Sequence, residues 1–457
     1  MKIFDTMDRT KKDLITAKDK RINLFVCGPT VYDYSHIGHA RTYVFFDLFA
    51  SYLRYRGYDV FYLQNITDID DKIIKKASET NSSPENVAEK YFREYLKDME
   101  ILMVNSVNIY APATHYMDEI VDQIKRLQQQ GYAYETGDGV YFEVNRFPDY
   151  GKLSHQKLEE IIAGYRVEIN ENKKNPVDFA LWKKKKGDEP YWNSPWGEGR
   201  PGWHIEDTAI TEHYFGPQYD IHGGGADLIF PHHECEIAQM ESVSGRKPMV
   251  RYWMHTGLLT IRSERMGKSM GNVIRIRDLT ERYSPWVIRY FLLSSHYRSP
   301  IDFSYENMDR AMESLEKIVV IYRKLKNRRT FGNGSKIMNE MEEEWNFLIN
   351  DMDDDLNTPG AISHMMKIIN LANRYYSDLS EVESKRIMEM IEDMNKFFKI
   401  LPEINETEEK LMNHILSIRE MMRKRKEYEI ADSIRNELNL MKIKIEDTSE
   451  GTVWYRI

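Results

Sequence analysis

The chain of 457 residues is 30% charged with a net charge of −9, typical of a soluble protein whose contacts with nucleic acid would depend on local basic patches. This length exceeds one hydrophobic core, so two to four domains are expected, and no apolar run is long enough to span a membrane. The only cysteines, Cys27 and Cys235, exclude a disulfide framework, and without an N-terminal secretory signal they lead us to expect a cytoplasmic protein.

The first 70 residues predict a strand, a helix and a second strand. Residues 24–26 form a short apolar run that ends at Gly28 and Pro29, which interrupt regular structure. The pattern predicts a helix over about 36–49 and a second strand at 60–63. This order is typical of a parallel α/β sheet, which binds its ligands at the carboxyl ends of the strands. We therefore expect a Rossmann-type parallel sheet with functional residues just after each strand.

Residues 108–200 differ in character and predict an insertion that splits this sheet. A helix is indicated by one apolar face, formed by Tyr116, Ile120, Ile124 and Leu127. A Gly-Asp-Gly turn at 137–139 then leads into a strand at 140–144. Two basic patches, 173–176 and 183–186, are either solvated loop charge or contacts with RNA phosphate.

The sequence after residue 305 predicts helices almost throughout. Two apolar stripes at helical spacing indicate the core of a helical bundle: Leu315, Ile318, Val319 and Tyr322, and Met388, Ile391, Met394, Phe397 and Phe398. Residues 353–359 interrupt the pattern as a helix boundary. From about residue 407 we expect a small terminal domain with a helix, a basic run at 423–426, and strands at 443–445 and 453–455.

Two signatures far apart in the chain carry the first functional signal. They are residues 35–41, with His36, Gly38 and His39, and residues 265–269, with Arg265, Lys268 and Ser269. In this order they resemble the paired ATP-handling motifs of class I aminoacyl-tRNA synthetases. The resemblance implies an enzyme that forms an acyl-adenylate.

The chemistry of adenylate formation suits these residue types. The carboxylate must lie in line with the α-phosphate of ATP, and the developing charge must be stabilised. His36 and His39 lie on one face of the predicted helix, and imidazoles at a helix start can donate to phosphate oxygens. Lys268 on a loop can clamp the phosphates. An isolated His-x-x-His is more often an ordinary helix start, and the second signature is what favours function.

A third cluster predicts a metal site. It comprises residues 202–207, 221–228 and 231–236, which are rich in histidine and carboxylate. His232 and Glu236 are four residues apart and share one helix face, a spacing typical of zinc ligands. Cys27, at the end of the first strand, is the natural thiolate to join them. The alternative is a simple His232–Glu236 pair, with Cys27 as a small buried residue.

Several segments together resemble the cysteinyl-tRNA synthetase family over the whole chain. They are residues 27–33, 65–72, 200–204, 222–225, 297–299 and 447–452. In that family zinc binds the thiolate of the substrate cysteine, so serine, a poorer metal ligand, is rejected. The resemblance implies L-cysteine, ATP with Mg²⁺ and tRNA(Cys) as partners, without DNA or membrane contact, and a monomer.

The resemblance also assigns site residues, with two departures from the family pattern. The second signature begins with Arg265 in place of lysine and has glycine in place of its central serine. The second zinc-ligand cysteine of the family aligns with Asp207, which gives Cys27, Asp207, His232 and Glu236 as the expected zinc ligands. Aspartate makes a harder, less thiophilic site, and Cys235 is an alternative sulfur ligand. The amino-acid pocket is expected to include Gly28, Thr67, Trp203, His222 and Asp227.

The resulting interpretation is a cysteine–tRNA ligase, with two alternatives. One is a ligase that passes cysteine to a small amine, and the other is an inactive tRNA-binding paralogue. The expected domains are a catalytic domain in two halves (1–107 and 201–255) around a connective insertion (108–200), a stem-contact region (256–310), a helical bundle (311–406) and an anticodon-binding domain (407–457). We expect the basic run at 423–426 to contact phosphate, and Trp454 either to face the anticodon pocket or to pack in the core.

Overall fold

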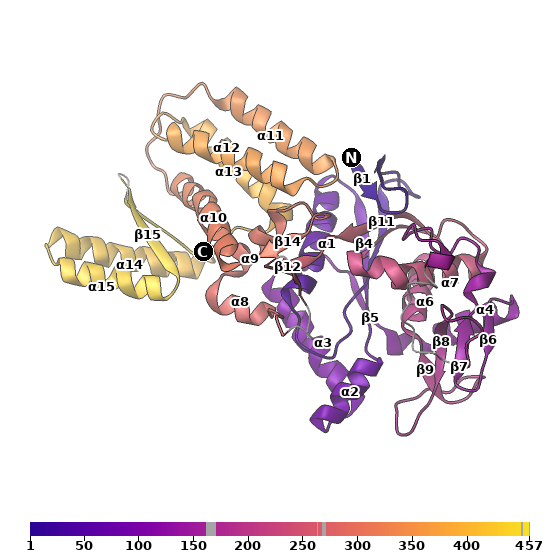
Figure 1. The fold of residues 1–457 in the computed structure, drawn as a ribbon. Coiled ribbons are helices and arrows are strands. Elements are labelled where there is room, and N and C mark those ends of the chain that lie inside the picture. Colours follow the sequence, from indigo (N-terminus) through magenta and orange to yellow (C-terminus); the bar gives the residue numbers. More distant parts are fainter. Residues whose placement is uncertain (161–170, 263, 267–270, 449–450, 457) are drawn as a thin grey trace. The chain divides into compact units, whose positions relative to one another are not determined.

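The computed structural model describes residues 1–457 except 161–170, 263, 267–270, 449–450 and 457. The chain forms two compact units (Figure 1). The first unit comprises Met1–Leu259 with Arg298–Pro300, and the second comprises Thr260–Tyr297 with Ile301–Ile457. Within the described ranges, no helix combines the length and the apolar character needed to cross a membrane.

A five-stranded parallel sheet forms the centre of the first unit, as expected. Its strand order is β11-β10-β3-β4-β5. The strands are β3 (Arg21–Val26), β4 (Asp59–Ile66), β5 (Ile109–Pro112), β10 (Tyr219–Gly225) and β11 (Val250–Thr256). Val26 at the end of β3 pairs with Gly223 of β10 on one side and Gln64 of β4 on the other. The residues that follow β3 therefore lie next to the carboxyl ends of both neighbouring strands.

Helices connect and cover these strands. Between β3 and β4 runs α1 (Ile37–Tyr55), which packs on the sheet, and α2 (Asp71–Thr80) and α3 (Pro84–Ile101) follow β4. The second half of the sheet is flanked by α6 (Trp203–Phe215) and α7 (Glu234–Ser244), which contact each other and α4 (Met117–Gln129). The carboxyl end of β10 continues into two short helical turns, η3 (Ala226–Leu228) and η4 (Ile229–His233).

An antiparallel sheet of four strands lies within the sequence between the two halves. It contains β6 (Ala133–Glu135), β7 (Gly139–Phe142), β8 (Phe179–Lys184) and β9 (Gly199–Pro201), in that order. The predicted turn at 137–139 joins β6 and β7. The expected boundary at 107/108 is too early, because β5 still pairs with β4 in the parallel sheet. Short segments around it are η1 (Ala113–Tyr116) and η2 (Val144–Arg146).

The N-terminal residues form a hairpin on the last parallel strand. Its strands are β1 (Lys2–Asp5) and β2 (Thr10–Asp13). The backbone N–H of Thr6 donates to the Trp253 carbonyl of β11 at 2.8 Å, and the Asp5 carboxylate accepts from the Trp253 N–H at 3.0 Å. These contacts fix Thr6 beside the carboxyl-terminal half of β11.

The second unit is mainly helical, as its apolar stripes predict. It contains α8 (Ile276–Arg282), α9 (Pro285–Leu293), α10 (Tyr305–Lys326), α11 (Met338–Asp353), α12 (Thr358–Arg374) and α13 (Glu381–Phe398), with the strands β12 (Leu259–Ile261), β13 (Glu264–Arg265) and β14 (Ile301–Phe303). Most members of both stripes are buried. The boundary expected at 310/311 is wrong, because it falls inside α10.

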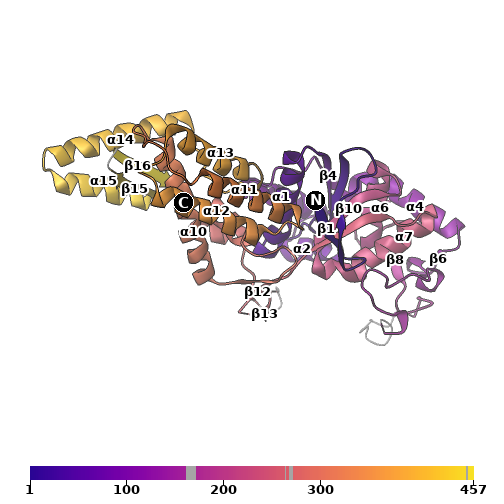
Figure 2. The ribbon, with the colours of Figure 1, turned by 90° about the horizontal axis from the view of Figure 1, so that it is seen from above.

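The last part of the second unit is a helical pair with a two-stranded sheet. In both views α14 (Glu406–Lys424) and α15 (Tyr428–Leu440) run side by side (Figures 1 and 2). The sequence analysis missed α15, but the strands β15 (Ile443–Thr448) and β16 (Gly451–Arg456) agree with it. Trp454 is only 1% exposed and packs in a core with Met412, Leu416, Leu438, Ile443 and Ile445. It therefore has the packing role, not a place on an exposed anticodon pocket.

Candidate active site and metal centre

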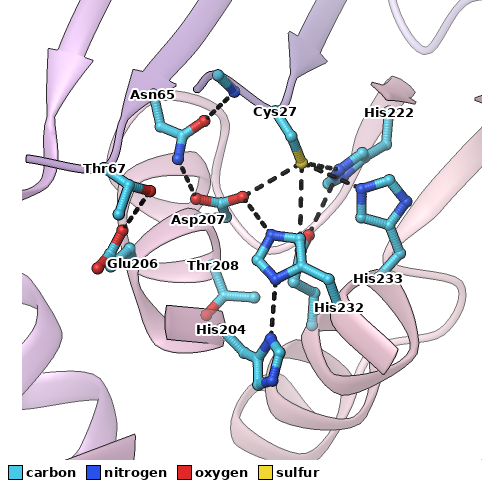
Figure 3. A network of polar contacts seen from close by, with 12 residues as sticks. Cys27, Asn65, Thr67, His204, Glu206, Asp207, Thr208, His222, His232 and His233 are labelled. Atoms are coloured by element: carbon cyan, nitrogen blue, oxygen red, sulfur yellow. Dashed lines mark hydrogen bonds and ion pairs between the residues drawn. The ribbon is translucent and has the colours of Figure 1, made fainter. Parts of the chain in front are cut away.

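Four buried side chains bring metal-binding atoms together beside the carboxyl end of β3. Cys27 follows β3, Asp207 lies in α6, His232 lies in η4 and Glu236 lies in α7. One donor atom from each lies within 4.8 Å of the others (Figure 3). These are the four residues that the sequence predicts as zinc ligands, and the structure brings all of them to one place.

The distances in this group suit a single four-coordinate cation. His232 Nε2 lies 3.0 Å from both Asp207 Oδ2 and Glu236 Oε1. Cys27 Sγ lies 3.3 Å from Asp207 Oδ2 and 3.9 Å from Glu236 Oε1. Ligands at about 2.0–2.3 Å from a tetrahedral zinc ion are separated by similar distances.

Two further histidines approach the same sulfur from its other side. His222 Nε2 lies 3.3 Å and His233 Nε2 lies 3.1 Å from Cys27 Sγ. With Cys27 and Glu236 they form a second group of closely spaced donors. Sequence reasoning placed His222 in the amino-acid pocket and missed His233, whose only signal was its position next to His232.

Cys235 does not take part in either group of donors. Its sulfur lies 3.3 Å from the hydroxyl of Tyr150, and the side chain is buried. Because Cys235 is next to Glu236 on α7, it points to a different side of that helix. The alternative sulfur ligand considered from the sequence therefore does not reach the site in this structure.

The electrostatics of the four-residue group favour a bound cation. Burial alone would lower the pKa of His232, but the carboxylates of Glu236 and Asp207 raise it to about 10. Burial raises the pKa of Glu236 to about 8, although His232 opposes the change. Within the described part of the chain, Glu236 Oε2 is buried and accepts no hydrogen bond. A buried carboxylate oxygen without a donor costs free energy, which a metal ion would recover.

Each ligand of the group is held in turn by a second residue. Asn65 donates from Nδ2 to Asp207 Oδ1 at 2.6 Å, and its own Oδ1 accepts from the Gly28 N–H at 2.6 Å. The Nδ1 atoms of His204 and His232 lie 2.8 Å apart. Such outer contacts fix the direction of metal ligands. They were not predicted, although Asn65 lies in a segment that the family resemblance marked.

The predicted pocket residues lie at different depths. Trp203 is 38% exposed and stacks on the His232 ring with centroids 4.1 Å apart. His222 is fully buried, and Thr67 donates to Glu206 Oε2 at 2.9 Å. Asp227, in η3, is exposed. Trp203 and His222 thus contact the metal-binding residues directly, whereas Asp227 lies nearer the solvent.

Gly28 allows the ends of β3 and β4 to approach closely. A Cβ atom there would lie 1.7 Å from the carbonyl oxygen of Asn65. Gly28→Ala is expected to lower the free energy of unfolding by about 1–3 kcal/mol, the usual cost of overpacking, and to slow cysteine activation by moving Asn65. Denaturant unfolding and pyrophosphate exchange measure the two effects. The control is Gly137→Ala, where nothing lies within 4 Å. Equal stability of both variants would contradict the prediction.

The first ATP signature forms the start of α1. His36 is the N-cap and His39 the third residue, and each Nδ1 accepts a hydrogen bond from the backbone N–H of the other, at 3.3 and 3.4 Å. Their rings stack with centroids 3.6 Å apart. Because Nδ1 accepts, the neutral rings carry their hydrogen on Nε2, which makes that atom a donor. Of the second signature, Lys268 and Ser269 lie outside the described residues, as does the side chain of Arg265.

Comparison with known proteins places the chain among the synthetases. Residues 14–313 match the model of the tRNA synthetases class I (C) catalytic domain, and residues 348–405 match the DALR domain. The cysteine–tRNA ligases of Thermoplasma volcanium and Thermoplasma acidophilum are 49% and 47% identical to it, each over 100% of both chains. The chain belongs to the cysteine–tRNA ligase family. It is therefore a ligase of protein biosynthesis that aminoacylates tRNA(Cys), as the sequence predicts.

Solved structures support the fold of this cysteine–tRNA ligase family member. The methionyl-tRNA synthetase of Mycobacterium tuberculosis with methionyl-adenylate has a TM-score of 0.63 at 16% identity. The similarity covers 83% of this chain and 90% of that one. A leucyl-tRNA synthetase complex from Agrobacterium radiobacter K84 has a TM-score of 0.64 at 10% identity, with 85% of each chain covered. At these identities the likeness concerns the fold, and it agrees with the predicted class I architecture.

Proposed function

We propose that this family member selects cysteine through a zinc ion held by Cys27, Asp207, His232 and Glu236. The observation that supports it most is the buried group of one sulfur, one imidazole and two carboxylates, with an oxygen of Glu236 that accepts no hydrogen bond among the described residues. When bound, zinc supplies a Lewis acid that accepts a thiolate in preference to a hydroxyl. The protein keeps Asp207 in position through Asn65 and covers His232 with Trp203.

The amino acid would bind beside this group, at the carboxyl ends of β3, β4 and β10. Gly28, Thr67, Trp203, His222 and Asp227 are the proposed pocket residues. Gly28 brings its backbone close to the β4 end, and His222 lies at the sulfur. The exposed carboxylate of Asp227 is suited to the substrate ammonium group, a charge that the buried residues would not accommodate.

ATP with Mg²⁺ would bind at the start of α1. The Nε2 atoms of His36 and His39 act as donors to phosphate, Gly38 offers no side chain that obstructs the nucleotide, and the helix N-terminus favours anions. We assign Arg265, Lys268 and Ser269 to the same phosphates. Together these groups hold ATP while the cysteine carboxylate attacks the α-phosphate, which forms cysteinyl-adenylate and pyrophosphate. The cysteinyl group then passes to the 3′ end of tRNA(Cys).

The RNA contacts are assigned to the second half of the chain. We propose a stem-contact function for residues 256–310, with the helical bundle after it, and anticodon binding for residues 407–457. In the basic run, Arg423 is paired with Asp447 and Lys424 with Glu420. Arg425 and Lys426 are exposed, and no ion pair to either is seen among the described residues. These two are the better candidates for phosphate contact.

Reversal of these two charges should weaken tRNA charging alone. Arg425→Glu with Lys426→Glu is expected to raise the KM for tRNA about tenfold, since two exposed phosphate contacts of about 0.7 kcal/mol each are lost. Cysteine-dependent pyrophosphate exchange should stay unchanged because it needs no RNA. The control reverses Lys75 and Lys76 on α2. An unchanged KM for tRNA would remove the phosphate assignment for this run.

One experiment tests the function as a whole. ATP–pyrophosphate exchange is measured with cysteine and with serine, with and without tRNA, and charging of tRNA(Cys) is followed in parallel. We expect exchange with cysteine, little with serine, and charging of tRNA. Exchange followed by transfer to a small amine, without charging, would favour the ligase alternative. Absence of exchange would favour an inactive RNA-binding protein.

A further inference from the structure

Two imidazole rings are directed at the Cys27 sulfur from the side away from Asp207 and His232. The Nε2 atoms of His222 and His233 lie 3.3 and 3.1 Å from Sγ, and both side chains are fully buried (Figure 3). The argument rests on the proposed metal site. A cysteine that binds zinc does so as a thiolate, and a thiolate can only accept hydrogen bonds. Both Nε2 atoms must then carry a hydrogen, so that each ring donates to the sulfur.

This requirement fixes the far side of each ring. A neutral imidazole with hydrogen on Nε2 has an acceptor at Nδ1. The Nδ1 atom of His222 lies 2.7 Å from the Tyr219 hydroxyl. The Nδ1 atom of His233 lies 2.8 Å from His255 Nε2. Tyr219 and His255 must therefore be the donors in these contacts.

The second contact extends one step further. If His255 donates from Nε2, its Nδ1 must accept, and Nδ1 lies 2.8 Å from the Thr6 hydroxyl. Burial lowers the pKa of His255 to about 3, so this ring is neutral. Thr6 is held in place by its own N–H, which donates to Trp253. Two hydrogen-bonded chains thus begin at a hydroxyl and end at one sulfur: Tyr219–His222–Cys27 and Thr6–His255–His233–Cys27.

We propose that Tyr219 and Thr6 are positioning residues that direct two N–H groups at the metal-bound Cys27 thiolate. Hydrogen bonds withdraw electron density from the sulfur, which then donates less charge to the metal. The metal becomes a better acceptor for the thiolate of the substrate. This matters in a site with three anionic ligands, Cys27, Asp207 and Glu236, whose charge otherwise exceeds that of a divalent cation.

The test uses Co²⁺ in place of zinc in the full-length protein. The sulfur-to-cobalt charge-transfer absorption band reports the electron density on the thiolate. Tyr219→Phe and Thr6→Val each remove one hydroxyl, so each should shift this band to longer wavelength, with a larger shift in the double variant. Thr6→Ser keeps the hydroxyl and should restore the original band. A residue with only a structural role would not give this pattern.

Matched controls remove hydroxyls that are not connected to the sulfur. Tyr252→Phe alters a residue of β11 whose hydroxyl donates to the Asp13 carbonyl, and Thr208→Val alters a buried residue next to Asp207 that donates to Gln123. Shifts no larger than in these controls would overturn the proposal. So would two cobalt ions per chain, because His222 and His233 would then be ligands. A protein that binds no cobalt at all would overturn the proposed metal centre itself. If Tyr219→Phe does not fold, the Val and Ser variants at Thr6 decide alone.

Discussion

Replacement of Lys268 by alanine is expected to lower cysteine-dependent pyrophosphate exchange by about 10²–10³-fold, the effect of removing one strong donor to the transition state. The lysine belongs to the second ATP signature, and its proposed role is to hold phosphate oxygens as charge develops on them. The thermal midpoint should change little, because a phosphate-binding lysine is not part of a hydrophobic core. Steady-state exchange and thermal unfolding measure the two properties.

The matched control is Lys75→Ala, which removes an exposed lysine of α2 far along the chain from both signatures. It should leave exchange unchanged. Exchange in Lys268→Ala at the level of the unaltered enzyme would show that another cation holds the phosphates. Arg265 would then be the next residue to test.

Restoring a sulfur ligand at position 207 is expected to strengthen the retention of zinc. Thiolate is a softer ligand than carboxylate, so Asp207→Cys should increase zinc affinity by roughly tenfold or more without abolishing activity. Protons compete with zinc for every ligand, so the unaltered protein should lose its metal first as the pH falls. Zinc content after dialysis against a chelator, at several pH values, measures both effects.

Cys235→Ser serves as the control for this experiment, because Cys235 contacts Tyr150 and belongs to neither donor group. Its zinc content should equal that of the unaltered protein. Less than about a tenth of an equivalent of zinc in fully active enzyme would contradict the metal centre, since a bound metal should be near stoichiometric. Sulfur recognition would then depend on His204, His222 and Trp203.

The sequence allowed the parallel sheet and much of the site to be predicted for one physical reason. Residues just after parallel strands collect at one edge of the sheet, so Cys27 after β3 and the segments after β10 had to meet. Chemically distinctive side chains in those segments then marked the ligands. Short apolar runs bounded by glycine and proline gave the strands, and regular spacing gave the bundle helices.

Other features depend on packing that no local pattern encodes. Tyr219 and Thr6 have ordinary neighbours in sequence, and they reach the sulfur only because the N-terminal hairpin lies on β11. β5 is a four-residue strand whose place is decided by its pairing with β4. Trp454 could be assigned to either role until its burial was known.

The metal-binding group also has a consequence for how the protein is made. Cys27 and Glu236 are 209 residues apart in the chain, and Asp207 and His232 also come from the later part. At a synthesis rate of 5–20 residues per second, the ribosome needs about 10 to 40 s between the first and the last of these residues. During that interval the nascent chain has a cysteine but no site to protect it. The metal can be loaded only after the later strands have emerged and joined the sheet, so the step that completes the fold also completes the centre.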